Sequence, residues 1–408
     1  MANAEIIAAG SELLTPSRLD TNSLWLTGEL NNIGIEVTRK SIVGDDRGRL
    51  TATIVRALDA AQVIVICGGL GPTEDDLTRE AAAAAVEREL VFNQQICDAL
   101  EERFRRFGRK MAANNRRQAY LIDGAEPLPN DRGTAAGQWI EDRGRVLILL
   151  PGPPNELKSM FSKHCVSKLK ATLPPNAIRT RQFRICGMSE SDLDNLIAPI
   201  YTRYTNPTTT ILSNVGGLEI HLRAQADTDE AAEALVEEVA SQIEPLIAPR
   251  IVSRNGDSIE KVVGDLLRSR GLRLSVAESA TGGMLGQWLT SVPHSSDYFA
   301  GGFIVYSDEM KMRLLCVQRE MLEQHTAVSA PVAQAMAEGA RERTGSDYAL
   351  SVTGYAGPDG EDVGTMFIGL AGPEGSEVVR IKMPGDRNRI RALTVQNSLD
   401  FLRRRLVK

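Results

Sequence analysis

Three short, almost entirely apolar runs constrain the fold of this chain more than any other feature. They occupy residues 4–8, 63–67 and 146–150, and each is closely followed by a glycine and then by residues that favour a helix start. Apolar runs of this length are typical of strands buried on both faces of a sheet. The repeated order of strand, glycine turn and helix therefore predicts an α/β fold with a largely parallel sheet.

The same reasoning divides the chain into three predicted domains. The first α/β domain covers residues 1–175 and ends in a helix that is closed by a Pro-Pro pair. Residues 176–254 combine strand-like and helix-like segments, which predicts a small α+β connecting domain. An Asn-Gly turn leads into residues 255–408, where strand and helix alternate again and predict a second α/β domain.

Composition narrows the range of functions. The 408 residues include 47 Lys or Arg and 53 Asp or Glu, which gives a net charge of −6. This acidic balance argues against binding to nucleic acid or anionic membranes, and no apolar run approaches the roughly 20 residues of a spanning helix. The five cysteines lack C-x-x-C spacing, which indicates reduced thiols without a zinc site. With no secretory signal in view, we expect a soluble cytoplasmic protein that acts on small molecules.

The second apolar run leads into the sequence V-I-V-I-C-G-G-L-G-P-T-E-D-D-L-T at residues 63–78. A glycine turn before a helix start offers free backbone N–H groups to an anion such as phosphate. Asp75 and Asp76, predicted to lie one turn into the helix, are suited to a divalent metal that bridges phosphates. The alternative is an acidic helix start that only suits the helix dipole. The predicted anion-binding residues are Gly68, Gly69, Gly71 and Thr73.

Polar loops also follow other strands of the same predicted sheet. Glu12 lies just after the first strand, Asp45 and Asp46 follow the second, and a glycine loop covers residues 130–137. Ligands of open α/β sheets bind at the carboxyl ends of the strands, so these loops favour a ligand site at one edge. The absence of G-x-x-x-x-G-K-[ST] excludes a P-loop NTPase.

A basic stretch over residues 103–117 has two interpretations. It is either a solvated surface or a segment from which Arg109 or Lys110 reaches a ligand phosphate. Only two aromatic residues interleave with the basic ones, so a nucleic-acid patch is the least favoured interpretation.

The N-terminal motifs resemble the molybdopterin-binding-like domain of the CinA family (competence/damage-inducible protein A). They are A-E-I-I-x-x-G-x-E-L-L, D-T-N, V-G-D-D, G-G-L-G-P-T-x-D-D-L-T-R-E and L-P-G-P-P-x-E, within about the first 170 residues. The resemblance implies a three-layer α/β domain that binds a nucleotide-type ligand and cleaves a diphosphate with a divalent metal, as an ADP-ribose pyrophosphatase does. Pro16 stands near a position where relatives commonly carry glycine, so that loop is expected to differ in shape. The candidates by motif are Glu12, Asp45, Asp46, Thr73, Asp75 and Asp76.

A second set of polar loops lies in the C-terminal domain. Residues 276–283 read V-A-E-S-A-T-G-G, and a Ser295-Ser296 pair, Tyr306 and Lys311 follow. A serine becomes a nucleophile when a base accepts its proton, and a lysine can be that base. Ser296 and Lys311 are fifteen residues apart, so a strand between them is expected to return the lysine to the serine. The alternative interpretation makes the serines a helix cap and Lys311 a surface lysine.

These C-terminal motifs resemble the nicotinamide-nucleotide amidase domain of the same family. They are A-E-S-x-T-G-G, S-S-x-x-F-x-G-G, V-x-Y-S-x-x-x-K, T-G-x-A-G-P-D-G and V-G-T, over about residues 258–405. The resemblance implies hydrolysis of nicotinamide mononucleotide to nicotinic acid mononucleotide and ammonia without a cofactor. Ser296 would be the nucleophile, Lys311 its base and Tyr306 a helper. The expected substrate-binding residues are Ser279, Thr281, Gly282, Gly283, Thr353 and Gly354.

Three positions depart from the family pattern in this domain. They are Ala280, which replaces a common cysteine, His294, which replaces a glycine, and Tyr355, which replaces an aliphatic residue. None removes the serine or the lysine, and the missing cysteine argues against a thiol nucleophile.

Taken with the resemblance, the motifs predict a bifunctional enzyme of pyridine-nucleotide salvage. The N-terminal domain would act on ADP-ribose with a divalent metal, and the C-terminal domain on nicotinamide mononucleotide. A homodimer is expected from the family alone. Two alternatives stay open: an N-terminal domain that only binds a pterin or nucleotide, and a competence or DNA-damage accessory factor that acts through protein partners.

Overall fold

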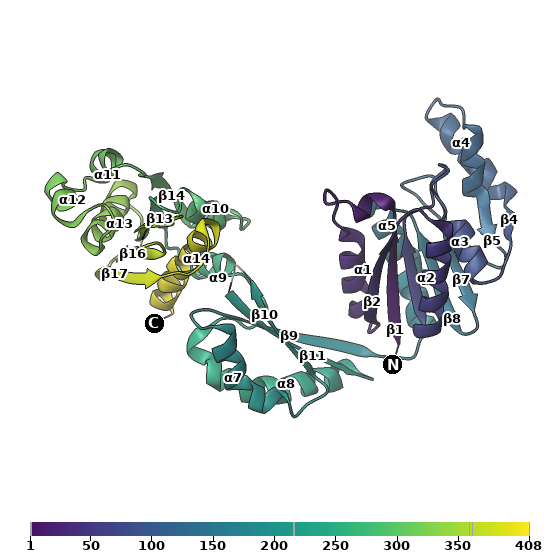
Figure 1. Ribbon diagram of the computed structural model, residues 1–408, viewed down its shortest axis with the longest axis horizontal. Coiled ribbons are helices and arrows are strands. Elements are labelled where there is room, and N and C mark those ends of the chain that lie inside the picture. The colour runs from purple at the N-terminus through teal and green to yellow at the C-terminus, as the bar shows by residue number, and fades with distance from the viewer. Residues whose placement is uncertain (1, 215–216, 359, 361, 408) are drawn as a thin grey trace. The chain divides into compact units, whose positions relative to one another are not determined.

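The computed structural model describes residues 2–214, 217–358, 360 and 362–407. The chain packs as two compact units, Met1–Arg179 with Ala224–Ala234, and Thr180–Arg223 with Leu235–Lys408. Figure 1 labels the elements of both units. Among the described residues, no helix combines the length and the apolar character that crossing a bilayer requires.

The first unit contains a six-stranded sheet in the order β2-β1-β3-β8-β7-β6. Strands β2, β1, β3 and β8 are parallel, and β7 and β6 are antiparallel additions at one side. Its elements are β1 (Asn3–Ala9), α1 (Thr21–Asn32), β2 (Glu36–Val43), α2 (Arg47–Ala60), β3 (Val63–Cys67), α3 (Thr78–Ala85), β4 (Leu90–Phe92), α4 (Gln94–Arg106), β5 (Tyr120–Ile122), β6 (Glu126–Leu128), β7 (Gly137–Asp142), β8 (Arg145–Leu150), α5 (Pro154–Met160) and α6 (Val166–Thr172), with short 3-10 helices at Ser11–Leu14 and Ala113–Ala119 and a π-helical turn at Phe161–Cys165.

The side chains of the central strands alternate between two apolar cores, one on each face of this sheet. Ile6 packs with Leu26 and Phe161 on one face, whereas its neighbour Ile7 packs with Ile54 on the other. Helices α1, α5 and α6 therefore cover one face and α2 and α3 the other, which makes three layers (Figure 1). The predicted strand at 63–67 is confirmed to the residue, and the other two are confirmed to within one residue at each end.

The parallel strands bring their polar loops to one edge. Strands β1, β3 and β8 run side by side in the same direction, so the turns at Gly10, Gly68 and Gly152 lie at their shared carboxyl ends. The Gly68 N–H donates to the carbonyl of Leu150 (3.0 Å), which ties two of these turns together. The expected edge for a ligand site is therefore present.

A small α+β segment follows, as predicted. Its four-stranded sheet has the order β10-β11-β9-β12. Its elements are β9 (Ala177–Ile185), α7 (Glu190–Tyr201), β10 (Thr208–Asn214), β11 (Gly217–Ala226), α8 (Asp229–Ile247), a 3-10 turn at Ala248–Arg250 and β12 (Ile251–Ser253).

The C-terminal α/β domain is built on a five-stranded sheet in the order β14-β13-β15-β16-β17. Strands β14, β13 and β15 are parallel, and β16 and β17 are antiparallel. Helices α9, α10 and α14 cover one face, and α11, α12 and α13 the other. The elements are α9 (Ile259–Ser269), β13 (Leu274–Glu278), α10 (Met284–Thr290), a 3-10 turn at Ser295–Asp297, β14 (Phe299–Ile304), α11 (Asp308–Leu315), α12 (Arg319–His325), α13 (Ala330–Thr344), β15 (Tyr348–Gly354), β16 (Thr365–Gly372), β17 (Gly375–Lys382) and α14 (Arg387–Leu406).

The fold makes a prediction about thiol reactivity. Burial raises the pKa of the Cys67, Cys165 and Cys186 thiols to about 12, whereas Cys316 is exposed. Because the thiolate is the reactive form, iodoacetamide at pH 8 should alkylate Cys316 and leave those three unmodified until the protein is unfolded. Peptide mass spectrometry measures this, and rapid labelling of Cys67 in the folded protein would contradict the buried position of the β3 end.

Candidate functional site

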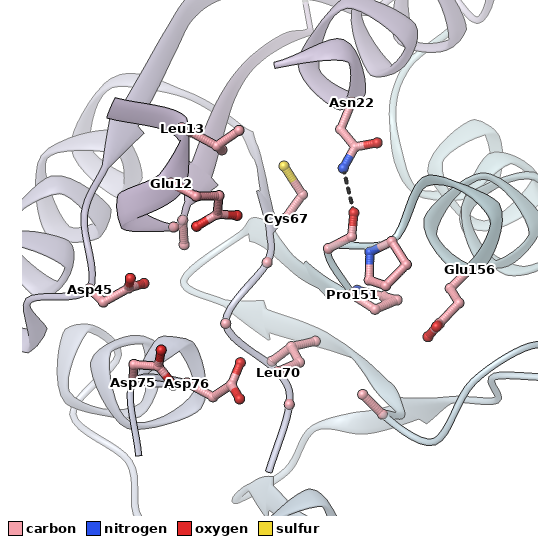
Figure 2. A pocket seen from close by; sticks show the side chains of 18 of the residues that line it. Glu12, Leu13, Asn22, Asp45, Cys67, Leu70, Asp75, Asp76, Pro151 and Glu156 are labelled. Carbon is pink, nitrogen blue, oxygen red and sulfur yellow. Dashed lines mark hydrogen bonds between the residues drawn. The ribbon is translucent and has the colours of Figure 1, made fainter. Parts of the chain in front are cut away.

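A cavity of about 570 Å³ lies at the carboxyl ends of β1, β3 and β8. In the view of Figure 2, Glu12, Asp45, Asp75 and Asp76 lie to one side of the segment that runs from Cys67 to Leu70, and Glu156 lies to the other. The structure thus brings together residues from the four separate segments that follow β1, β2, β3 and β8. The sequence-predicted residues that line the cavity are Glu12, Asp45, Gly68, Gly69, Gly71, Thr73, Asp75 and Asp76.

The glycine loop after β3 is held rigid by a buried arginine. The Arg79 guanidinium donates to the carbonyls of Leu70 (2.7 Å) and Gly71 (2.9 Å). Gly69 has a φ of +66°, and a Cβ there would lie 2.2 Å from Thr78 Oγ1, so no larger residue fits. These contacts fix the shape of the loop from within the protein, which is the property a preformed binding site needs.

Asp75 and Asp76 precede the helix instead of lying within it. Helix α3 begins at Thr78, so the predicted position one turn into the helix is wrong. Asp76 Oδ2 accepts hydrogen bonds from the Thr73 N–H (2.9 Å) and hydroxyl (2.5 Å). These side-chain hydrogen bonds hold residues 73–76 in a turn at the position where the first turn of the helix was predicted. The nearby Thr73 side chain and the Asp75 backbone N–H lower the pKa of Asp75 below its ordinary value.

Asp45 and Asp46 are neighbours in sequence but have different roles. Asp45 Oδ2 accepts from the Ser11 N–H (2.8 Å), which joins the loop after β2 to the loop that carries Glu12. Asp46 instead caps α2, because its Oδ1 accepts from the Arg49 N–H (2.8 Å). Asp46 does not line the cavity, so its sequence-based assignment as a metal ligand is corrected to that of a helix cap.

The donors in the cavity fit a divalent metal that arrives with its ligand. Among the described residues, no three His, Cys, Asp or Glu side chains are grouped closely enough to hold a metal by themselves. The carboxylate oxygens of Glu12, Asp45, Asp75 and Asp76 are nevertheless the donor type that Mg²⁺ prefers. Mg²⁺ is commonly held by one or two carboxylates together with substrate phosphates, not by a closed protein cage.

The sequence analysis did not name Asn22 and Glu156, two further polar residues of the cavity, as site residues. Asn22 Nδ2 donates to the carbonyl of Gly152 (2.7 Å), while its Oδ1 is buried with no partner among the described residues. Glu156 accepts from Asn130 Nδ2 (2.7 Å). Both belong to quoted motifs, D-T-N and L-P-G-P-P-x-E, and the motif was the signal that could have found them.

The basic stretch supports the cavity through a residue other than the expected ones. Arg117 donates to the carbonyl of Thr73 (2.9 Å) and pairs with Glu74 (3.1 Å) and Glu80 (3.2 Å). Arg109 and Lys110 are exposed and do not line the cavity. The arginine therefore positions the aspartate loop, and the exposure of Arg109 and Lys110 agrees with the interpretation of that part of the stretch as a solvated surface.

The C-terminal motifs meet at a second sheet edge. Residues 279–283 follow β13, Tyr306 follows β14, and Thr353 lies near the end of β15. Strand β13 pairs in parallel with both neighbours, so Glu278 lies opposite Ile304 on one side. Most of the predicted amidase residues thus share the carboxyl edge of this sheet.

Glu278 organises the loop that follows β13. Its buried carboxylate accepts backbone hydrogen bonds from Gly283 (3.0 Å), Leu285 (3.0 Å) and Gly286 (2.8 Å). These are the free N–H groups at the start of α10, which a carboxylate stabilises both as acceptor and by its charge. The sequence analysis quoted this residue within A-E-S-x-T-G-G but gave it no role.

Several predicted donors are already used by the protein. The Gly283 N–H serves Glu278, and the Thr353 hydroxyl donates to the carbonyl of Ala327 (2.8 Å). Their assignment as free substrate donors is corrected accordingly. The Thr281 hydroxyl, by contrast, is buried and has no partner among the described residues. The other predicted ligands are Ser279, which is half-buried, Gly282, which is exposed, and Gly354, which pairs with Met366 between β15 and β16.

Lys311 is buried, with 1% of its surface exposed, so it is not the surface lysine of the alternative interpretation. Its Nζ donates to Asp308 Oδ1 (3.1 Å), at the first residue of α11. Tyr306 is 65% exposed, and its hydroxyl accepts from Arg387 (3.3 Å), which also donates to the carbonyl of Gly357 (2.9 Å). The tyrosine and the lysine amine both lie where the chain leaves β14.

Ser296 lies at the opposite edge of the sheet. The Leu274 N–H at the start of β13 donates to the carbonyl of Tyr298 (2.7 Å), and the Val305 N–H donates to that of Glu278 at its end (2.8 Å). β14 therefore runs the whole length of β13, roughly 13 Å for five residues. Within one chain the strand separates Ser296 from Lys311 instead of returning one to the other, and that part of the prediction is corrected.

Comparison with known proteins identifies the family. Three family models match the chain: "Probable molybdopterin binding domain" over residues 5–171, "Damage-inducible protein CinA KH domain" over 180–252 and "CinA C-terminal domain" over 256–406. A CinA-like protein of Solibacter usitatus is 55% identical over 99% of this chain and 98% of its own. The chain belongs to the CinA family. A CinA-like protein of Koribacter versatilis is 47% identical over 99% of this chain and 100% of its own.

The matched stretches fall within the predicted ranges 1–175, 176–254 and 255–408. The middle one adds a KH relationship that the predicted small α+β domain did not include. Among solved structures, the competence damage-inducible protein A of Klebsiella pneumoniae is 35% identical over 36% of this chain and 95% of its own, with a TM-score of 0.36.

The Glu278 contacts make a local prediction. Glu278→Gln removes the charge and turns a donor toward backbone N–H groups, which should cost the loop about 2 kcal/mol, or about 30-fold faster hydrogen exchange in residues 279–288. The matched control is Glu342→Gln, an exposed residue of α13, which should change nothing there. Mass spectrometry of exchanged peptides measures this. Equal protection in both variants would show that the carboxylate does not hold the loop.

Proposed function

We propose that the N-terminal domain hydrolyses the diphosphate bond of an ADP-ribose-type nucleotide with the help of a divalent metal. The observation that carries the proposal is the convergence of a rigid glycine loop and four carboxylates, from Glu12, Asp45, Asp75 and Asp76, on one cavity. Neighbouring phosphates suit backbone N–H groups at a glycine turn, and the cavity volume of about 570 Å³ is within the range of ligand sites.

The charge of the cavity explains why a metal is part of the proposal. Among the described residues it is lined by six carboxylates and one guanidinium, that of Arg18. A diphosphate placed there alone would be repelled, because like charges a few ångströms apart repel each other. A divalent cation bound together with the substrate would remove that repulsion and polarise the phosphoryl oxygens.

The chain's own residues would divide the remaining work. One or two of the Glu12, Asp45, Asp75 and Asp76 carboxylates would hold the cation together with the substrate phosphates, and the glycine loop fixed by Arg79 would orient those phosphates. The buried Asn22 Oδ1 is an acceptor that a ribose hydroxyl would satisfy. Attack by water on one phosphorus and departure of the other phosphate would then yield AMP and ribose 5-phosphate.

The test compares two aspartates. Asp76→Asn should lower the kcat of Mg²⁺-dependent ADP-ribose cleavage by about 10²-fold or more, while ADP-ribose binding weakens by less than about 10-fold, because the charge acts mainly on the transition state. Asp46→Asn is the matched control, since asparagine caps a helix as well as aspartate does and Asp46 is outside the cavity. AMP release and calorimetry on the same samples measure both quantities.

The outcomes separate the open alternatives. Tight ADP-ribose binding by the wild-type protein without turnover in Mg²⁺, Mn²⁺ or Co²⁺ would leave a binding domain for a nucleotide or pterin. Neither binding nor turnover would favour an accessory factor that acts through protein partners. Equal loss of turnover in Asp76→Asn and Asp46→Asn would remove the proposed role of Asp76.

We further propose that the C-terminal domain is a nicotinamide mononucleotide amidase. The observation that favours this function is the buried Lys311 amine, which lies with Tyr306 at the carboxyl edge of the C-terminal sheet, where the chain leaves β14. A buried lysine is an expensive feature that structural stability alone seldom requires. A serine hydroxyl would attack the amide carbon while Lys311 takes its proton. That proton would leave with ammonia, and water would hydrolyse the acyl ester to nicotinic acid mononucleotide and restore the serine.

Ser296→Ala and Lys311→Ala should each lower ammonia release from nicotinamide mononucleotide by about 10³-fold or more, and the double variant should lose little beyond that, because such residues act as a unit. Chelation by EDTA should leave ammonia release unchanged while it stops ADP-ribose cleavage. If Ser296→Ala keeps wild-type turnover, Ser279 at the carboxyl edge becomes the nucleophile to test. Loss of both activities in EDTA would contradict a metal-free amidase.

A further inference from the structure

Among the described residues, one positive side chain lines the N-terminal cavity, that of Arg18, and six carboxylates line the same space. The Arg18 side chain is exposed. Its guanidinium has no hydrogen-bond or ion-pair partner in the part of the chain that the structure describes. A positive group that shares a cavity with carboxylates but is paired with none of them is available to a ligand.

The other arginines near this cavity are already used by the protein. Arg79 donates to two backbone carbonyls of the glycine loop. Arg117 donates to a carbonyl of the loop that carries Asp75 and pairs with two glutamates. Arg103 donates to two backbone carbonyls of the loop that follows β6. Each of these guanidinium groups holds a loop in place, whereas Arg18 has no such structural role.

The segment that carries Arg18 crosses the cavity from one side to the other. It leaves β1, which lies between β2 and β3 in the sheet. At its start the Ser11 N–H donates to Asp45 Oδ2 (2.8 Å), and the Asp45 N–H donates to Ser11 Oγ (2.9 Å). At its end the Asn22 side chain donates to a carbonyl of the loop after β8 (2.7 Å). Residues 11–22 therefore extend from the loop after β2 to the loop after β8.

Between these two anchors the described hydrogen bonds stay within the segment. The Arg18 N–H donates to the carbonyl of Thr15 (3.5 Å), and the Thr15 hydroxyl bonds to that of Ser17 (2.9 Å). Leu19, the next residue, is 85% exposed and also lines the cavity. A loop that is fixed at both ends keeps the guanidinium at the cavity while its long side chain stays free to reach a ligand.

We propose that Arg18 binds the diphosphate of the substrate and stabilises the charge that cleavage creates there. This inference rests on the proposed diphosphate hydrolysis and adds a substrate-contacting residue to that site. A guanidinium matches two phosphate oxygens with two parallel hydrogen bonds and stays charged at any physiological pH. The carboxylates of the cavity are suited to the cation, and Arg18 is suited to phosphate oxygens that the cation does not contact.

The bond changes of the reaction explain why a second positive group is useful. A water oxygen bonds to one phosphorus, and the bond from that phosphorus to the bridging oxygen breaks. The bridging oxygen keeps the electron pair and leaves on the other phosphate, which gains one negative charge, while one proton of the water is released to solvent. The lining carboxylates oppose this added charge. An arginine beside the leaving phosphate offsets it, as positive groups do in other phosphoryl transfers.

The test removes the guanidinium and then returns it. Arg18→Gln should lower the kcat of Mg²⁺-dependent ADP-ribose cleavage by about 10²-fold and weaken ADP-ribose binding in calorimetry by about 10-fold, because a charge-assisted hydrogen bond is lost. Arg18→Lys should recover part of the loss, since it keeps the charge without the planar fork. Guanidinium ion added at millimolar concentration to Arg18→Ala should raise its turnover, which a merely structural role of the arginine would not produce.

The matched control is Arg39→Gln, a substitution of an exposed arginine of β2 that does not line the cavity. It should leave both turnover and binding unchanged. Neither glutamine variant should shift the melting temperature, because the Arg18 guanidinium makes no contact that holds the described fold together.

Failure of this inference is distinguishable from failure of the proposed hydrolysis. Wild-type turnover and affinity in Arg18→Gln would show that the guanidinium does not contact the substrate. Equal losses in Arg18→Gln and Arg39→Gln would indicate a general effect of surface charge and overturn the specific role. If the wild-type protein binds ADP-ribose without cleaving it, the hydrolysis proposal fails alone, and an unchanged affinity in Arg18→Gln would then remove the phosphate contact too. A wild-type protein that neither binds nor cleaves ADP-ribose would remove both.

Discussion

The common direction of the buried strands is the constraint on which both candidate sites depend. In the first sheet β1, β3 and β8 are parallel, and in the C-terminal sheet β14, β13 and β15 are parallel. Parallel strands need crossover helices, so every loop that leaves a strand at its carboxyl end appears at the same edge. Residues that are far apart in sequence, such as Glu12 and Glu156, therefore share one cavity.

Buried charged residues have different roles at the carboxyl edges of the N-terminal and C-terminal sheets. In the N-terminal cavity the buried positive charge of Arg79 stiffens the glycine loop, while the carboxylates face the open space. In the C-terminal domain the buried carboxylate of Glu278 is consumed by the backbone at the start of α10. The first arrangement leaves negative charge available for a cation, and the second neutralises a helix end.

The edge strand β14 decides what a single chain can do at the second site. A strand of six residues separates its two flanking segments by the height of the sheet. It therefore places Ser296 and Lys311 at opposite ends of the strand within one chain. The two edge strands of this sheet also differ in charge, because β14 carries no charged residue whereas β17, at the opposite edge, does.

Much of this protein was determined by local sequence alone. The apolar runs predicted the central strands to within a residue, because burial acts over a few neighbouring residues, and eight residues that the motifs singled out line the cavity. The cap formed by Asp46, the loop position of Asp75 and Asp76, the support from Arg117 and the separation of Ser296 from Lys311 were decided only by the tertiary structure. Each depends on which backbone group or strand partner a residue meets across the fold, and the spacing of residues along the chain does not contain that information.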